Sequence, residues 1–328
     1  LSVGEMVNPA SNLIPFNFIP IQNKSKLKRM GIQDLTKFLR DTCPGIYEEI
    51  HLAEYAFKKV AIDMSIYMCR YKAKGDLWLG SLINLIACLR RNEIHAVFIY
   101  DTSAPPEKDN ERKERAEARD KTDLRICSLE DALDEYYKTD VVSPVLIEFY
   151  EKRSDKLPSL RNKASRIDIK FIQDAVTRMR SQQFVITPED YALTKELLDI
   201  MNVPYFNAPM EAETMAADLC KRGLVDAVLT EDSDVVCYET PIWLSKIDTA
   251  ANKCMRINYQ SLIATLEFSS DELLDFCIMC GCDYNQRVKG IGSAKSFDRI
   301  TQYRTIEKVD ENTKEDIACL NHVRTREL

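Results

Sequence analysis

Short apolar runs rich in β-branched residues alternate with amphipathic stretches along the chain, and several of these runs end in an acid. One run, 59–62, precedes Asp63, and another, 96–100, precedes Asp101. Between them the leucines and isoleucines of 79–89 have helical spacing, which predicts a helix crossing from one strand to the next. We therefore expect an α/β fold, with a central, mostly parallel sheet flanked by helices and a site at the carboxyl ends of its strands.

Other stretches have a helical pattern. The apolar spacing of 31–39 predicts a first helix, and the charged segment from 107 to about 180 has no strand-like period, so it is interpreted as a helical insertion. Thr187 and Pro188 have the cap and the first-turn proline of a helix start. The side chains expected to point inward from that helix are Leu193, Leu197, Leu198 and Ile200.

Composition excludes several classes of protein. With 328 residues, 45% of them hydrophobic, the chain can bury a substantial core in one large domain or two small ones. No apolar run is long enough to span a bilayer, so no membrane partner is expected. Eleven cysteines without a disulfide pattern indicate an intracellular, reducing compartment. Only three histidines are present, which disfavours histidine-centred hydrolysis and leaves carboxylates as the main reactive groups.

Seven acids follow apolar runs or open predicted helices. They are Asp63, Asp101, Glu211, Glu213, Asp232, Asp234 and Asp283. Two divalent ions roughly 4 Å apart can activate water and stabilise the leaving oxygen in phosphodiester hydrolysis, and magnesium prefers oxygen ligands. The acids therefore predict a metal-dependent nuclease. The net charge of −7 is unusual for a nucleic-acid-binding protein, but the seven acids account for all of it, and a neutral remainder can carry a local basic stripe.

The paired acids allow more than one interpretation. If 230–234 is extended, Asp232 and Asp234 point to the same side, and the alternative is a solvated acidic turn. Glu211 and Glu213 fall in the first turn of a predicted helix, where residues two apart do not share a face. They would serve different ions, or one would act through water, and the alternative is capping of the helix dipole.

A glycine turn follows the last acid. Gly290 and Gly292 precede a predicted helix in the manner of a helix-hairpin-helix, in which backbone amides approach a phosphate, and Lys289 and Lys295 flank the turn. Nearby sulfurs suggest zinc, but they lack a fourth neighbouring ligand, so core packing is the preferred interpretation of Cys277, Cys280 and Cys282.

Four basic residues in the insertion fall at steps of four, three and four. Lys108, Arg112, Arg115 and Arg119 would therefore share one face of a helix. The alternative is a ladder of ion pairs within the helix, such as Glu111 with Arg115.

Several motifs occur in an order that resembles the flap endonuclease family of structure-specific 5′ nucleases, over about residues 30–310. The motifs are Met30-Gly31-Ile32-Gln33-Asp34-Leu35, Val60-Ala61-Ile62-Asp63-Met64-Ser65-Ile66-Tyr67, Phe98-Ile99-Tyr100-Asp101 with Pro105-Pro106, Ala208-Pro209-Met210-Glu211-Ala212-Glu213, Thr230-Glu231-Asp232-Ser233-Asp234, Gly281-Cys282-Asp283-Tyr284 and Gly290-Ile291-Gly292.

The resemblance implies a nuclease with two Mg²⁺ ions, replaceable by Mn²⁺, that cuts DNA near the junction of a 5′ flap and a duplex in replication or repair. It places Asp63, Asp101, Glu211 and Glu213 around one ion, and Asp232, Asp234 and Asp283 around the other. It makes the insertion a helical arch through which the 5′ strand passes, with Lys108 and Arg115 steadying the scissile phosphate.

We further expect Lys108, Arg112 and Arg115 to act in catalysis, by orienting and neutralising the phosphate. The residues expected to contact DNA are Gly31, Tyr67, Arg70, Arg119, Lys289, Gly290, Gly292 and Lys295. The sequence departs from the family at Tyr67, which lies four residues after Asp63, whereas the family's stacking aromatic lies about six after its aspartate, where this chain has Cys69. The segment between Asp101 and Glu211 is also longer than usual for the family.

The expected divisions are a non-native or disordered leader at 1–29, an N-terminal nuclease segment at 30–106, a helical arch at 107–185, an internal nuclease segment with a helix-hairpin-helix at 186–310, and a truncated C-terminal segment at 311–328. We expect Met30 to be the native start. No clamp-binding segment of the Gln-x-x-Leu-x-x-Phe-Phe type is visible, so sliding-clamp recruitment is not expected.

A monomer acting in the nucleus or at another site of DNA replication is expected. The alternatives are a 5′→3′ exonuclease or junction resolvase of the same superfamily, including one that acts on RNA, and a non-catalytic nucleic-acid scaffold.

Overall fold

The computed structural model describes residues 31–154 and 167–328. The expected leader, 1–29, and the expected start at Met30 lie outside the described residues.

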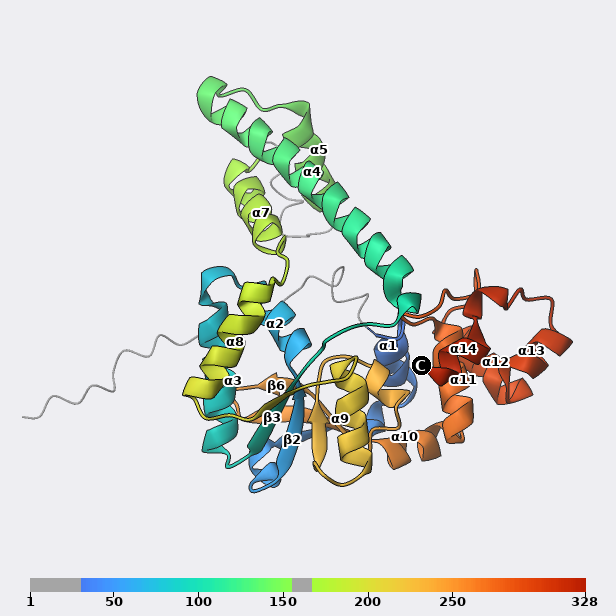
Figure 1. The fold of residues 1–328 in the computed structure, drawn as a ribbon. Coiled ribbons are helices and arrows are strands. Elements are labelled where there is room, and N and C mark those ends of the chain that lie inside the picture. The colour runs from blue at the N-terminus through green and yellow to red at the C-terminus, as the bar shows by residue number, and fades with distance from the viewer. Residues whose placement is uncertain (1–30, 155–166) are drawn as a thin grey trace, which may run out of the picture.

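A seven-stranded sheet lies at the centre, in the order β1-β7-β6-β5-β2-β3-β4 (Figure 1). Its strands are β1 Glu48–His51, β2 Lys59–Asp63, β3 His95–Tyr100, β4 Tyr205–Asn207, β5 Ala227–Leu229, β6 Ile242–Asp248 and β7 Lys253–Asn258. β6, β5, β2, β3 and β4 run parallel, whereas β7 is antiparallel to both β6 and β1. The predicted α/β fold with a mostly parallel sheet is confirmed.

Helices cover both faces of the sheet because its strand residues alternate between two cores. Along β2, Val60 and Ile62 belong to one core and Ala61 belongs to the other, as the period of two in a strand requires. The first core is shared with α2 Met64–Lys72, α3 Trp78–Arg91 and α8 Pro188–Ile200. The second is shared with α1 Leu35–Thr42, α9 Ala212–Lys221, α10 Tyr259–Leu266 and α11 Ser270–Cys280.

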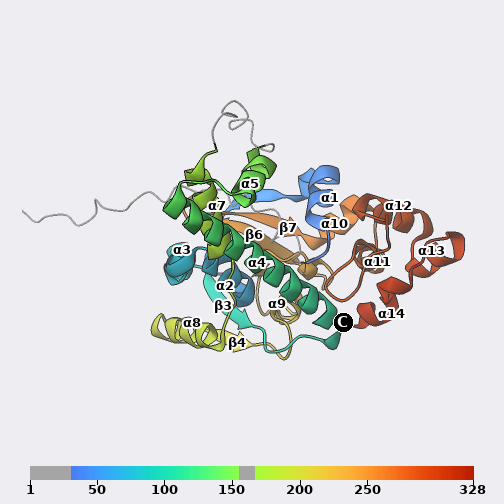
Figure 2. The same ribbon diagram turned by 90° about the horizontal axis from the view of Figure 1, so that it is seen from above.

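The insertion is helical and forms a core of its own. It contains α4 Asp109–Thr139, α5 Pro144–Ser154 and α7 Ile169–Ser181, which rise away from the sheet as an arch-like arm (Figures 1 and 2). Leu129, Leu146 and Ile172, one from each helix, are almost fully buried against one another in this arm. We call these three helices the arch.

Two helices differ from expectation. α1 begins at Leu35 rather than at Gly31, because Gly31 (φ 72°) and Asp34 (φ 58°) have left-handed backbones that a helix does not allow. α8 begins with the predicted cap at Thr187, but its buried face consists of Asp190, Thr194 and Leu198.

Leu193 and Ile200 are exposed, so the inward positions predicted for them are wrong. Thr194 takes an interior position because its hydroxyl accepts a hydrogen bond from Tyr100 (2.9 Å). Leu198 is fully buried, and Leu197 packs at the edge of the same core.

The C-terminal part is helical, with α11 followed by α12 Ser293–Tyr303, α13 Ile306–Asn312 and α14 His322–Glu327. Short 3₁₀ turns complete the fold: η2 Pro44–Ile46, η3 Leu52–Tyr55, η4 Gly75–Leu77, η5 Pro106–Lys108, η6 Asp234–Val236 and η7 Ala318–Leu320. Across the described ranges, no helix combines the length and the apolar character needed to cross a bilayer.

Candidate active site

Adjacent parallel strands deliver the first two acids to one edge of the sheet. Asp63 ends β2, and Asp101 follows β3, its parallel neighbour. Asp63 caps α2 by accepting a hydrogen bond from the Ile66 amide (3.2 Å), and it accepts another from the Thr230 hydroxyl (3.2 Å). Asp101 accepts from the Ala212 amide at the start of α9 (2.6 Å), which ties that helix to the edge.

Asp232 and Asp234 lie in a tight turn after β5. The Asp232 amide donates to the Thr230 hydroxyl (3.1 Å), and the Asp234 amide donates to the Asp232 carboxylate (3.0 Å). Asp234 opens the 3₁₀ turn η6, so the extended conformation predicted for this segment is wrong. Both side chains are nevertheless buried, at 5% and 4% exposure, which also excludes a solvated turn.

The remaining acids approach from α9 and from the loop after α11. Glu211 is the cap residue of α9, and Glu213 lies in its first turn, as predicted. The Glu211 carboxylate accepts hydrogen bonds from the Lys108 ammonium and from the Tyr284 hydroxyl. Asp283 follows α11 and accepts from the Arg115 guanidinium (3.2 Å to each oxygen).

Burial and mutual repulsion make four of the acids, Asp63, Glu213, Asp232 and Asp234, costly to ionise. Burial, followed by the charge of Asp101, raises the pKa of Asp63 to about 8. Burial is also the main cause of the raised pKa values of Glu213, Asp232 and Asp234, and neighbouring acids of the same cluster add to each of them. Such a cluster gains stability from any cation that enters it.

The donor set suits a hard divalent cation. Every candidate ligand is a carboxylate, and the Asp234 Oδ1 atom is buried with no hydrogen-bond partner in the part of the chain described. As the side chains stand, no three His, Cys, Asp or Glu residues within the described ranges are placed to hold one ion. The cations that approach the cluster here are Lys108 and Arg115.

Gly31 packs closely against the turn that carries Asp232 and Ser233. A Cβ atom at this position would lie 2.2 Å from Asp232 Oδ1 and 2.5 Å from Ser233 Oγ, and the φ of 72° also favours glycine. The next amide, of Ile32, donates to the Ser233 hydroxyl (3.1 Å). Gly31 was expected to contact DNA, and the structure places it against the turn that carries Asp232.

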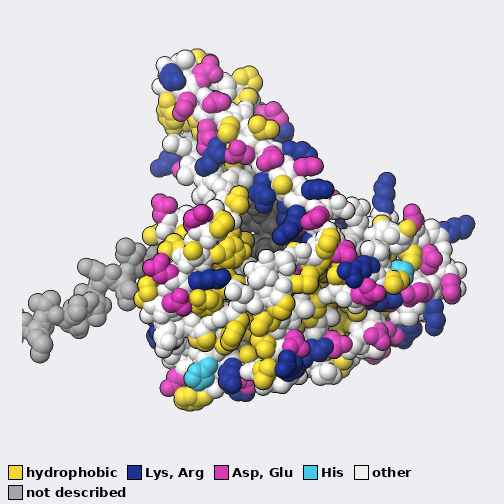
Figure 3. All heavy atoms as spheres, in the orientation of Figure 1, with side chains coloured by type: hydrophobic (Ala, Val, Ile, Leu, Met, Phe, Trp, Pro, Cys, Tyr) yellow, Lys and Arg dark blue, Asp and Glu magenta, His cyan; other side chains and the backbone are white. Residues whose placement is uncertain are grey.

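Two of the predicted arch residues reach the acids. Lys108 contacts Glu211 and lies 3.4 Å from Asp283, and only 12% of its side chain is exposed. Burial lowers the pKa of Lys108, but the nearby carboxylates of Glu213, Asp283 and Glu211 outweigh burial and raise it, so its ammonium stays charged. Basic side chains also gather on the surface at the lower end of the arch (Figure 3).

Arg115 forms an ion pair with Glu111 on its own helix and another with Asp283 in the acid cluster. Both the ion-pair ladder and the basic face predicted for this helix therefore involve Arg115. Arg112 is exposed, and Arg119 is half-buried. Both residues lie on α4 of the arch.

Two expected DNA contacts are not supported by their surroundings. The Tyr67 ring is fully buried and packs against Tyr71 (5.7 Å between ring centroids), so it presents no face to a base. Arg70 is paired with Glu231 at 2.5 Å, which neutralises its charge locally. Tyr67 lies on the core side of α2.

The glycine turn has the predicted backbone. Gly290 has φ 81°, and Gly292 is the cap residue of α12. Lys289 and Lys295 are exposed at this turn, and the Lys295 ammonium donates to the Gly290 carbonyl (3.2 Å).

The cysteines considered for zinc lie in or against the core. Cys277 and Cys280 are fully buried on α11, and Cys282 packs against the same apolar cluster. They agree with the packing interpretation.

Sequence reasoning missed Tyr284. Its hydroxyl donates to Glu211 and lies 3.0 Å from the Tyr238 hydroxyl, and the Lys108 ammonium lies over its ring at 5.1 Å from the centroid. Its position directly after Asp283 was the only available signal, because its partners come from distant parts of the chain.

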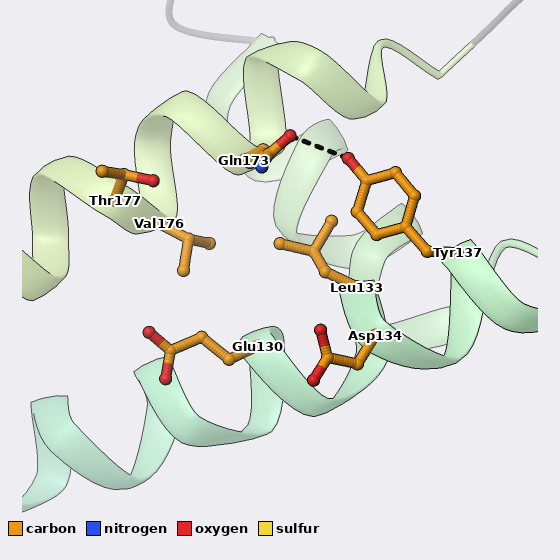
Figure 4. A pocket seen from close by; sticks show the side chains of 7 residues that line it. All are labelled: Glu130, Leu133, Asp134, Tyr137, Gln173, Val176 and Thr177. Carbon is orange, nitrogen blue, oxygen red and sulfur yellow. Dashed lines mark hydrogen bonds between the residues drawn. The ribbon is translucent and has the colours of Figure 1, made fainter.

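A surface pocket on the arch is separate from the acids. It lies between α4 and α7, where the Tyr137 hydroxyl donates to Gln173 (2.7 Å; Figure 4). Glu130 and Asp134 line it, and their charge would repel a phosphate, so no role in phosphodiester chemistry is assigned to it.

Comparisons with known proteins agree with this geometry. The chain matches the models of the XPG N-terminal domain at 30–122 and of the XPG I-region at 202–283. It is 34% identical to a probable RAD2-like endonuclease, 369L, of Invertebrate iridescent virus 6, over 91% of this chain and 79% of the relative. It is 31% identical to flap endonuclease 1 of Nematostella vectensis, over 86% of this chain and 70% of the relative.

Solved structures share the fold. The catalytic core of Rad2 in complex with a DNA substrate has a TM-score of 0.59 at 21% identity, covering 86% of this chain and 71% of that one. The junction-resolving enzyme GEN1 in complex with product DNA and a Mg²⁺ ion has a TM-score of 0.52 at 15% identity, covering 84% and 55%. Together with the two family models, the sequence relatives show that this chain belongs to the XPG family of structure-specific 5′ nucleases, which includes flap endonuclease 1.

Proposed function

We propose that this 5′ nuclease hydrolyses DNA phosphodiesters near the junction of a 5′ flap and a duplex, with two Mg²⁺ ions that Mn²⁺ can replace. The observation that carries the proposal is that acids from β2, β3, α9, the turn after β5 and the loop after α11 interact with one another and are met by Lys108 of η5 and Arg115 of α4. The Rad2 and GEN1 structures were solved with DNA, and that of GEN1 also with Mg²⁺, which supports DNA as the substrate and Mg²⁺ as the ion.

The acids would divide between the two ions. Asp63, Asp101, Glu211 and Glu213 would hold one ion, and Asp232, Asp234 and Asp283 the other. The bound ions would supply an activated water and stabilise the charge of the leaving oxygen.

The chain's cations would hold the phosphate. With divalent ions neutralising the acids, the charges of Lys108 and Arg115 would be available to the scissile phosphate. Arg112 is exposed on the arch. Tyr284 would keep Lys108 near Glu211 through its ring and its hydroxyl. These residues would orient the phosphate before the bond breaks.

The duplex would be held by backbone contacts. Lys289, Lys295 and the amides of the turn at Gly290 and Gly292 are exposed or partly exposed and suit phosphate binding without sequence readout. Arg119 would extend the basic face along the arch. A role in DNA replication or repair fits a substrate with a 5′ flap.

The test is a digestion of end-labelled flap, nicked, four-way, blunt and RNA substrates with and without Mg²⁺, with the cleavage positions mapped. Cleavage at the flap base that requires Mg²⁺ is expected. Preferred cleavage of four-way DNA, of RNA or from a blunt 5′ end would instead favour the resolvase or exonuclease alternatives.

The matched control is Asp101→Asn, which keeps the oxygen that accepts from the Ala212 amide while removing the charge. It should bind the flap and fail to cut it. Binding without Mg²⁺-dependent cleavage in the unmodified chain would favour the scaffold alternative.

A further inference from the structure

α14 reaches the base of the arch. The Arg324 guanidinium donates to Glu107 (2.7 Å) and also pairs with Glu327 on its own helix (3.0 Å). Glu107 lies in η5, the short turn from which α4 starts. Figures 1 and 2 both place the C-terminal end of the chain beside this end of α4.

α14 is itself fixed to the body of the protein. Arg326 donates twice to Asp275 of α11 (2.7 Å each) and also pairs with Glu307 of α13. Asp275 is 3% exposed and also accepts from the Ile306 amide (3.1 Å), which adds a backbone contact to the same junction. These contacts fix α14 to α11 and α13. α11 is the helix that precedes Asp283.

Arg324 contacts Glu107, the residue next to Lys108, whose ammonium contacts the acid cluster. Glu107 directly precedes Lys108, and η5 contains only three residues, Pro106–Lys108. Pro105, just before it, is buried. Glu107 and Lys108 are consecutive residues of one short turn. A contact that fixes the Glu107 side chain therefore also restricts the position of the Lys108 backbone.

The Glu107 carboxylate is well placed to receive this contact. One of its oxygens accepts from Arg324, and the other is buried with no hydrogen-bond partner within the described ranges. The Arg324 guanidinium also holds the pKa of Glu107 below its usual range, and the carboxylate stays charged.

We propose that Arg324 is a positioning residue, which fixes the base of the arch through Glu107 so that the Lys108 ammonium stays at the acid cluster. α14 then links two parts of one site: it holds α11, which delivers Asp283, and it holds η5, which delivers Lys108. The inference rests on the proposed function in so far as Lys108 acts on the scissile phosphate.

Charge reversal tests the link. Arg324→Glu should lower the single-turnover cleavage rate about five-fold, because a partly exposed ion pair can change the fraction of molecules with Lys108 in place by about that factor. Flap affinity and the thermal midpoint should stay close to those of the unmodified protein. Glu107→Arg should act similarly, and the double reversal should restore most of the rate. Arg256→Glu is the matched control, because Arg256 also has two acidic partners, Glu48 and Glu54, but lies on β7.

A double-mutant comparison separates positioning from general damage. In a Lys108→Ala background, Arg324→Glu should produce no further loss, because Arg324 acts through Lys108. An additive loss in this background, or no rescue by the double reversal, would overturn the proposal.

A second readout does not depend on cleavage. In EDTA, reaction of Lys108 with an amine-directed anhydride, followed by mass spectrometry, should be several-fold faster in Arg324→Glu, with exposed Lys289 unchanged as the internal reference. Equal labelling of Lys108 in both proteins refutes the positioning role. If the unmodified chain cuts no substrate, the proposed function fails, and the labelling result still decides whether Arg324 positions Lys108.

Discussion

Replacing Asp63 by asparagine should stabilise the metal-free protein while abolishing cleavage. Asparagine keeps an oxygen to accept from the Ile66 amide, is itself a good cap residue, and can donate to the Thr230 hydroxyl. The substitution therefore removes one buried negative charge from the cluster, keeps the hydrogen bond from the Ile66 amide and reverses the direction of the one with Thr230.

The size of the effect follows from the pKa of Asp63, which burial and Asp101 raise from 3.8 to about 8. Because the folded state keeps its proton to higher pH than the unfolded state, this carboxyl costs nothing below about pH 4. Stability is then lost as the pH rises toward 8. At about 1.4 kcal/mol per pH unit, the upper limit of the cost is roughly 2 kcal/mol at pH 5 and roughly 5 kcal/mol at pH 7.5.

The assay is urea unfolding of both proteins in EDTA at several pH values between 4 and 8. The free energy of unfolding of Asp63→Asn should exceed that of the unmodified protein by an amount that grows with pH. Asp76→Asn is the control, because Asp76 is exposed, and it should show no such growth. Added Mg²⁺ should stabilise the unmodified protein more than Asp63→Asn. A variant that is less stable at pH 7.5, or a difference that does not change with pH, refutes the reasoning.

Three further predictions concern other parts of the site. Gly31→Ala should lower the cleavage rate at least ten-fold and reduce the thermal midpoint, because the added Cβ would displace the Asp232 side chain and because alanine disfavours the positive φ at position 31. An unchanged rate would contradict this. Lys289→Ala with Lys295→Ala should weaken duplex binding and reduce the slope of log affinity against log salt by about 2, whereas an unchanged slope would mean that neither ammonium contacts phosphate. Tyr67→Phe should leave flap binding and cleavage unchanged and raise stability by up to about 1 kcal/mol, because within the described ranges the buried hydroxyl has no hydrogen-bond partner; a loss of binding would restore a role in DNA contact.

The sheet and its acids could be predicted because they depend on local patterns. Residues 59–63 and 95–101 combine a short apolar run with a terminal aspartate, and parallel strands that carry such ends meet at one edge. The start of α8 directly after its cap residue, Thr187, followed from capping chemistry, which acts over three residues.

The errors come from features that depend on distant partners. The buried threonine of α8 could not be recognised without Tyr100, which satisfies its hydroxyl. The turn at Asp232 depends on the Thr230 hydroxyl and on the approach of Gly31, and the late start of α1 depends on the left-handed backbone that this approach requires. The role of Tyr284 was hidden for the same reason.

The most direct test of the central claim is the Mg²⁺ dependence of single-turnover cleavage of a 5′-flap substrate by the unmodified protein and by Asp232→Asn. The asparagine keeps the oxygen that accepts from the Asp234 amide, so the turn should persist. The account predicts that the unmodified protein cuts near the flap junction only with Mg²⁺, and that Asp232→Asn binds the flap with similar affinity but does not cut it. Cleavage by Asp232→Asn at the unmodified rate, or cleavage by the unmodified protein in EDTA, would contradict the assignment of these acids as metal ligands.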